Sequence, residues 1–206
     1  MKKQSTLPNS SFEDAQARFR ELRATINETA GSILSQEFPF PIQVLPISEE
    51  AAGIADRWEY RDHHIEHRPG WSWAKELRRY QRKPRHIEAA FYVDDGQTRD
   101  LWGLMLGKMS DSRVVAALHY IERNPTSTRA VQFANAALRY LELFAAAAGC
   151  AVFAVNNPHP DLVEYYKSKG LGRAHVKGKK LIRLECDVAL YRNGVALPNG
   201  IVHDHK

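Results

Sequence analysis

The chain has 206 residues, of which 44% are hydrophobic and 26% charged, a balance that excludes a fibrous or wholly disordered protein. Its net charge of +5 favours anionic partners such as a phosphorylated cofactor or a nucleic acid. No apolar run approaches the roughly 20 residues that span a bilayer, and the first residues lack the apolar core of a signal peptide, so we expect a cytoplasmic protein. Cys150 and Cys186 stand in apolar stretches and are predicted to be buried thiols rather than a disulfide.

The first 41 residues form a polar N-terminus followed by one amphipathic helix. Ser10 and Glu13 have the spacing of a capping box, and apolar residues recur at helical spacing over 12–34. The alternating Phe-Pro sequence at 38–41 ends this helix, since proline lacks the backbone donor that a helix needs. The narrow apolar stripe leaves three roles open for the extension: docking on the body, homodimerisation or partner binding.

The main domain, predicted over 42–190, alternates strands and helices and leaves 191–206 as a C-terminal tail. Proline and glycine positions separate the elements, and the Asp-Asp-Gly-Gln sequence at 94–97 is typical of a turn. Residues 177–180 read as the tip of a hairpin. The predicted elements are strand 42–47, helices 48–66 and 71–81, strands 86–93, 101–109 and 113–121, helix 130–148, strand 151–155, helix 160–169 and strand 181–188.

The segment 148–171, AGCAVFAVNNPHPDLVEYYKSKGL, carries the most specific pattern in the chain. A strand runs into Asn156-Asn157, and a helix bearing Tyr165-Tyr166 ends at Gly170. This pattern, together with the element order over roughly 42–188, resembles the Gcn5-related N-acetyltransferases. The resemblance implies an α+β fold with a mixed, mostly antiparallel central sheet and flanking helices, plus the N-terminal helical extension. It also implies acetyl-coenzyme A as co-substrate and no metal.

In that family a loop of the form Arg-x-x-Gly-x-Gly/Ala, between the fourth strand and the long helix, binds the cofactor pyrophosphate. Helix N-termini suit this task because their free amides and dipole favour negative charge. The corresponding residues here are 129–134, RAVQFA, where Gln132 replaces the middle glycine and can block the backbone or offer its own amide. The hydroxyls of 126–128 either add donors or simply cap the helix. The cofactor-binding residues implied are Ile121, Arg123, Thr128, Arg129, Ala130, Val131, Gln132, Phe133, Ala134 and Asn157, with Asn156 as the alternative to Asn157.

The resemblance also implies two catalytic residues. Tyr166 is the expected proton donor to the departing thiolate, because a phenol of pKa about 10 can protonate a thiolate whose acid has a pKa of about 8.5. Tyr165 is expected to pack in the core instead. Glu122 is the expected general base, with His119 as runner-up. Strand alternation predicts that Leu118, Tyr120 and Glu122 share one face and His119 the other. The structural alternatives are a packed tyrosine and a solvated Glu122–Arg123 pair.

The first two helices form the acceptor side of the cleft in related folds. By that analogy Trp58, His63, His64, Trp71 and Trp73 are candidate substrate-binding residues. His63 and His67 lie one helical turn apart, but no third ligand accompanies them, so we expect no metal site. The basic run 75–85, KELRRYQRKPR, can contact RNA or phosphate, or be the solvated side of a helix.

The predicted function is acetyl transfer from acetyl-coenzyme A to an amine by direct attack. The acceptor is either a protein lysine or N-terminus, or an aminoacyl-tRNA as in toxin relatives. Three alternatives stay open: a catalytically inactive binding module that kept the fold, an RNA-interacting or toxin-like protein, and an exported effector.

Overall fold

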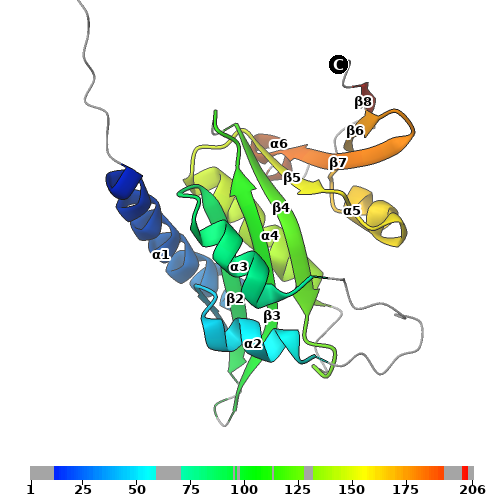
Figure 1. Cartoon of the computed structure of the whole chain (residues 1–206). Helices are drawn as coiled ribbons and strands as arrows, with labels where there is room; N and C mark the ends of the chain where they lie inside the picture. The colour runs from blue at the N-terminus through cyan, green and yellow to red at the C-terminus, as the bar shows by residue number, and fades with distance from the viewer. Residues whose placement is uncertain are drawn as a thin grey trace, which may run out of the picture.

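The computed structural model describes residues 12–58, 71–94, 96, 98–112, 114–127, 132–192 and 201–203 (Figure 1). Residues 1–11 and the remaining gaps lie outside this description. The elements are α1 (Phe12–Glu37), β1 (Ile42–Leu45), α2 (Glu49–Asp56), α3 (Trp73–Gln81), β2 (His86–Asp94), β3 (Arg99–Met109), β4 (Val115–Arg123), α4 (Phe133–Ala147), β5 (Val152–Asn156), the 3-10 turn η2 (Pro160–Leu162), α5 (Val163–Ser168), β6 (Arg173–Lys177), β7 (Lys180–Asp187), α6 (Val188–Arg192) and β8 (Ile201–His203).

Within the described ranges the strands form one sheet in the order β1-β2-β3-β4-β5-β7-β6-β8. The β4–β5 and β6–β8 pairs are parallel and the others antiparallel, so the predicted mixed, mostly antiparallel sheet is confirmed. The hairpin tip is also confirmed, since Lys177 pairs with Lys180 and Gly178 has a φ of 60°. The sequence did not predict β6, α6 or β8.

Helices cover both faces of the sheet, and each face has its own core (Figure 1). Residues of α1, α4 and α5 pack with the larger core, which includes Phe91, Trp102 and Phe153 of the sheet. Residues of α2 and α3 form a smaller core with Leu104 and Leu106 of β3. Both cysteines are buried and free, as predicted. The sheet is therefore held from both faces by separately packed helical layers.

The helix predicted over 48–66 begins as expected but ends early. Ser48 caps it by accepting a hydrogen bond from the Ala51 amide, and the helix ends at Asp56. The Asp56 carboxylate then caps α3, accepting bonds of 2.7 Å from both the Ser72 hydroxyl and the Trp73 amide. A carboxylate at a helix N-terminus satisfies free amides and interacts favourably with the dipole. Residues 59–66 of the predicted helix lie outside the described residues.

The N-terminal helix α1 docks on its own chain. Phe19, Ile26, Ala30 and Leu34 are all at most 5% exposed within the larger core. At its C-terminal end, Glu37 accepts three hydrogen bonds from the Nε and Nη2 atoms of Arg139 in α4. Of the three roles left open for this helix, the structure therefore shows intramolecular docking.

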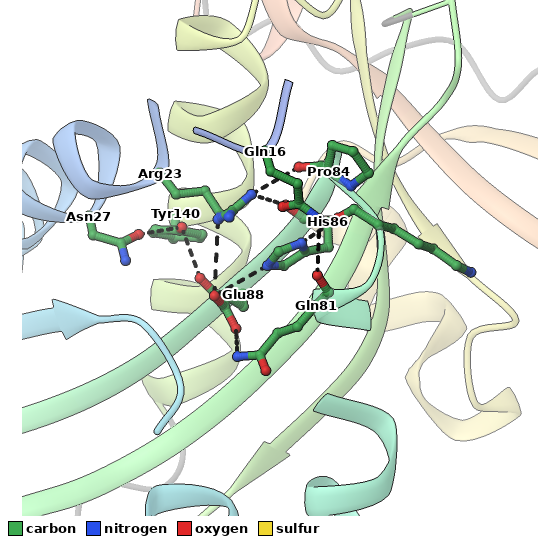
Figure 2. Close-up of polar contacts among 9 residues, drawn as sticks. Gln16, Arg23, Asn27, Gln81, Pro84, His86, Glu88 and Tyr140 are labelled. Carbon is green, nitrogen blue, oxygen red and sulfur yellow. Dashed lines mark hydrogen bonds and ion pairs between the residues drawn. The ribbon is translucent and has the colours of Figure 1, made fainter. Parts of the chain in front are cut away.

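A buried polar network completes the docking of α1 (Figure 2). Arg23 donates to the Pro84 carbonyl at 3.0 Å, and Glu88 accepts from Gln81 and contacts His86 Nε2 at 3.2 Å. Tyr140 of α4 donates to Asn27 Oδ1 at 2.6 Å, and burial raises the pKa of this phenol. Buried polar groups in proteins are mostly hydrogen-bonded, and the bonds described here favour one position of α1 on the sheet, while Asn27 Nδ2 and His86 Nε2 are buried atoms without a hydrogen bond among the described residues.

Tyr140→Phe is expected to lower the free energy of unfolding by about 1–2 kcal/mol, because buried Asn27 loses its donor. The measurement is urea unfolding followed by tryptophan fluorescence. Tyr165→Phe is the matched control, since its hydroxyl also bonds an asparagine side chain, Asn135, but in a partly buried place. An equal loss in the two variants would contradict a special role for the buried pair.

Candidate active site

The sheet opens between β4 and β5. These strands pair in parallel only from Val115↔Val152 to Leu118↔Val155, whereas β4 continues to Arg123 with β3 as its partner on the other side (Figure 1). Beyond Leu118 the backbone of β4 therefore has no ladder with β5 on this side. We call this opening, bounded by 119–123 of β4 and the end of β5, the splay.

A β-bulge lies at the start of the splay. Tyr120 pairs with Leu106 and Leu118 pairs with Gly107, so His119 is an extra residue on β4. A bulge disrupts the alternation of side chains. Leu118 consequently packs in the larger core, while Tyr120 packs against the smaller one. The prediction that Leu118 shares a face with Tyr120 and Glu122, opposite His119, is therefore wrong.

His119 links α3 to β5 across the splay. Its Nδ1 lies 2.5 Å from the Tyr80 hydroxyl, and its Nε2 lies 2.8 Å from Asn156 Nδ2. Burial, with smaller contributions from Lys108, Lys83 and Arg79, lowers the pKa of His119 to about 4. The imidazole is consequently neutral at physiological pH, which a ring with two hydrogen-bond partners of this kind requires.

Glu122, the predicted base, is only 7% exposed. Its Oε2 accepts a hydrogen bond of 2.5 Å from the Trp73 indole. This contact excludes a simple solvated pair with Arg123 and fixes the carboxyl group against α3. Glu122 and the His119 ring both approach α3, so the two candidate bases lie on the same side of the sheet.

Aromatic side chains form a wall beside Glu122. The Trp71 ring makes edge contacts with the Trp73 and Tyr120 rings, each with centroids 4.8 Å apart. Trp73 is fully buried and Trp58 is 8% exposed, and both belong to the smaller core, whereas Trp71 is partly exposed. His63 and His64 lie outside the described residues.

Of the two asparagines, Asn156 lies at the splay and Asn157 does not contact His119. Asn157 is exposed with a φ of 44°, and its amide donates to the Ile182 carbonyl. Asparagine tolerates this left-handed conformation better than most residues. Asn157 thus has the conformation of a turn residue, and which of the two asparagines contacts a cofactor stays a prediction.

The chain leaving β4 is anchored by Asn124, which sequence reasoning missed. Its Nδ2 donates to the Leu101 carbonyl, and its Oδ1 accepts from both the amide and the hydroxyl of Thr126. Arg123 is exposed, and Ile121 packs against the larger core. An asparagine before Pro-Thr is typical of a local turn, which was the available signal. Thr128, Arg129, Ala130 and Val131 of the predicted phosphate loop lie outside the described residues.

Among the described residues the long helix α4 begins at Phe133, and residues 130 and 131 of the predicted helix lie outside the described residues. Gln132 occupies the capping position, is exposed, and makes no capping hydrogen bond through its side chain. Ala134 is partly buried. Phe133 is 2% exposed and packs against Phe91 and Trp102, while Gly103 gives it room, because a Cβ there would lie 2.3 Å from the ring. Any cofactor contact of Phe133 is therefore restricted to its backbone.

Tyr166 lies on α5 in the larger core and is 2% exposed. Burial, then the neighbouring Tyr165, raises the pKa of Tyr166 to about 12, so the phenol stays protonated at physiological pH. Tyr165 is less buried and donates to Asn135 at 2.9 Å. The expectation that Tyr165 is the core residue of the pair is thus reversed. Gly170, with a φ of 88°, follows the helix as predicted.

The described part of the chain holds neither a cluster of metal-ligand residues nor a helix that could span a membrane. No group of three or more His, Cys, Asp or Glu there is arranged to hold a metal ion. None of the helices described has both the length and the apolar character to cross a membrane.

No family model matches the sequence, and no curated protein matches it significantly. Solved structures do. A domain from Methanocaldococcus jannaschii aligns at 8% identity and a TM-score of 0.54, covering 71% of this chain and 97% of that one. Mycobacterium smegmatis RimJ in complex with CoA-disulfide aligns at 15% identity and a TM-score of 0.51, covering 74% and 89%. An acetyltransferase from Thermus thermophilus aligns at 15% identity and a TM-score of 0.49, covering 71% and 96%.

The two alignments with TM-scores above 0.5, together with the strand order, show the fold class. The chain has the acyl-coenzyme A N-acyltransferase fold of the Gcn5-related N-acetyltransferases, as the sequence predicted. At such low identities the likeness concerns the fold alone, and activity has to be argued from the site itself.

Proposed function

We propose that this protein transfers an acetyl group from acetyl-coenzyme A to an amine. The observation that carries the proposal is the splay, where β4 continues five residues past the end of its ladder with β5, from His119 to Arg123. An acyl-coenzyme A arm is an extended chain with amide groups, and strand edges bind such chains through backbone hydrogen bonds. The side chain of Gln132, at the capping position of α4, is exposed and makes no capping hydrogen bond, and helix N-termini are sites where anions bind.

The reaction needs a neutral amine, a polarised carbonyl and a proton for the departing thiolate. Acetyl-coenzyme A would supply the activated thioester. In the proposal Glu122 accepts the proton of the attacking amine and Tyr166 donates one to the thiolate. The roles of Ile121, Arg123 and residues 128–134 at the cofactor are proposed on the family resemblance, and Trp71 is proposed as the exposed part of the acceptor wall.

Isothermal titration of the whole chain with coenzyme A and acetyl-coenzyme A tests the proposal. Arg129→Ala is expected to weaken coenzyme A binding about ten-fold or more, because a charged contact to phosphate is lost. The melting temperature should stay within a few degrees of the wild-type value. Arg20→Ala is the matched control, because Arg20 is an exposed arginine of α1 with no proposed role at the cofactor. An unchanged dissociation constant in Arg129→Ala would refute the loop assignment.

A second function, a binding module without catalysis, is favoured by Gln132 at the position of the family glycine. The same titration separates the two functions. No heat at high micromolar acetyl-coenzyme A would support the module, and binding without acetyl transfer would do so as well.

The surface of α3 favours an anionic acceptor. Its single acidic residue, Glu76, is buried, whereas the basic side chains on and just after this helix are exposed. Those exposed residues are Lys75, Arg78, Arg79, Arg82 and Lys83. We therefore propose aminoacyl-tRNA as one acceptor and a protein lysine or N-terminus as the other. Radiolabelled acetyl-coenzyme A, offered with total aminoacyl-tRNA or with lysine-containing peptides in separate assays, distinguishes them, and RNA binding should weaken steeply with salt.

A further inference from the structure

His119 occupies a position at the splay that the proposed chemistry does not use. It is the first residue of β4 beyond the ladder with β5 and the extra residue of the bulge on the β3 side. His119 is therefore in neither strand ladder, unlike Leu118 and Tyr120 beside it. Its ring contacts Tyr80 of α3 on one side and Asn156 at the end of β5 on the other.

The hydrogen bonds assign the tautomer of the ring. Asn156 Nδ2 can only donate, so Nε2 of His119 accepts and the proton lies on Nδ1. Nδ1–H then donates to the Tyr80 hydroxyl, which is anchored in the smaller core at 3% exposure. The chain of bonds runs from a fixed tyrosine, through a neutral imidazole, to the amide of Asn156.

This arrangement decides which atom of Asn156 is available. Its Nδ2 is held by His119, while its Oδ1 makes no hydrogen bond to the described residues. Without the imidazole, the side-chain amide of Asn156 could rotate and turn either Oδ1 or Nδ2 towards a ligand. A carbonyl oxygen held at the splay suits a ligand that carries amide N–H donors.

We infer that His119 is a positioning residue, which holds Asn156 against Tyr80 so that Asn156 Oδ1 faces acyl-coenzyme A as an acceptor. The inference rests on the proposed function for the identity of that ligand. It assigns His119 no proton transfer, because both ring nitrogens are already bonded. The low pKa of His119 agrees with this role, since a protonated ring could not accept from Asn156.

Three substitutions separate the two bonds. In His119→Gln the side-chain amide can place a polar atom near the position of Nε2. In His119→Asn the shorter amide can place one near the position of Nδ1. His119→Phe keeps an aromatic ring at this position and loses both hydrogen bonds. We expect His119→Gln to bind coenzyme A within about two-fold of wild type. His119→Asn and His119→Phe should bind about ten-fold more weakly, the cost of one misplaced hydrogen bond. Melting temperatures of all three show whether affinity simply follows stability.

The Asn156 side-chain amide signal in ¹⁵N NMR spectra provides a readout that needs no ligand. It should move in His119→Asn and His119→Phe and stay near its wild-type position in His119→Gln. An amide signal unmoved in all three variants overturns the positioning role. If the signal behaves as expected and wild type binds no coenzyme A, the proposed function fails while the link to Asn156 stands. Equal affinities in His119→Gln and His119→Asn would overturn the role in cofactor binding.

Discussion

Tyr166→Phe is expected to lower acetyl-transfer turnover ten-fold or more and to leave coenzyme A affinity within about two-fold of wild type. Only proton donation to the thiolate is lost, and that step belongs to the transition state. The phenyl ring keeps the packing of a residue that is 2% exposed, so the variant should fold. The measurement is the transfer of radiolabel from acetyl-coenzyme A to the acceptor pool that wild type uses.

Tyr165→Phe is the matched control for this experiment. The two tyrosines are adjacent on α5, but the Tyr165 hydroxyl is occupied by Asn135. Removal of the Tyr165 hydroxyl should change turnover by less than about two-fold, as expected for a group that takes no part in the transition state. If the collapse of turnover occurs in Tyr165→Phe instead, Tyr165 is the donor, and unchanged turnover in both variants eliminates a tyrosine donor on this helix.

Acid is expected to destabilise the fold through His119. The pKa of its imidazole is about 4 in the folded protein and about 6.5 in the unfolded chain, so the unfolded chain binds more protons between these values. The contribution of His119 to the free energy of unfolding is therefore complete above pH 6.5, and about 3 kcal/mol of it is lost as the pH drops towards 4. The groups that face the ring are Tyr80, Arg79 and Lys83 from the α3 side, Lys108 from β3 and Asn156 from β5.

His119→Gln isolates this contribution because glutamine does not titrate. The free energy of unfolding from urea titrations at a series of pH values should show a wild-type excess that shrinks between pH 6.5 and 4. Other groups, such as the partly exposed carboxylates, act equally in both proteins and cancel in the difference. A difference that does not vary with pH in this window would mean that His119 titrates normally in the folded state.

The sheet and its flanking helices could be predicted because their signals are local. Periodicity located the strands β2–β5 and β7, and Ser48, Gly149 and Gly170 marked helix ends where capping or positive φ is needed. β6 was missed because its sequence, RAHVK, is polar, and its charges are satisfied by β7, as when Arg173 donates to Glu185 and Asp187. That compensation is invisible without the partner strand.

The site was less predictable because its decisive features are relations between distant segments. The bulge at His119 exists only as a mismatch in length between β3 and β4, so simple alternation placed Leu118 on the wrong face. Asn156 and Asn157 are equally good turn residues in isolation, and the His119 ring, 37 positions away, distinguishes them. Tyr166, in contrast, was named from its spacing to Gly170, and its role stays a prediction.

The Asp56 carboxylate has a consequence for the position of α3. By binding Ser72 and the Trp73 amide, it joins the last residue of one helix to the first turn of the next, independently of the chain in between. The position of Trp73 at the start of α3 is thereby set by residues that the structure describes on either side of 59–70. Sequence changes that spare Asp56 and Ser72 are therefore expected to leave the start of α3 in place.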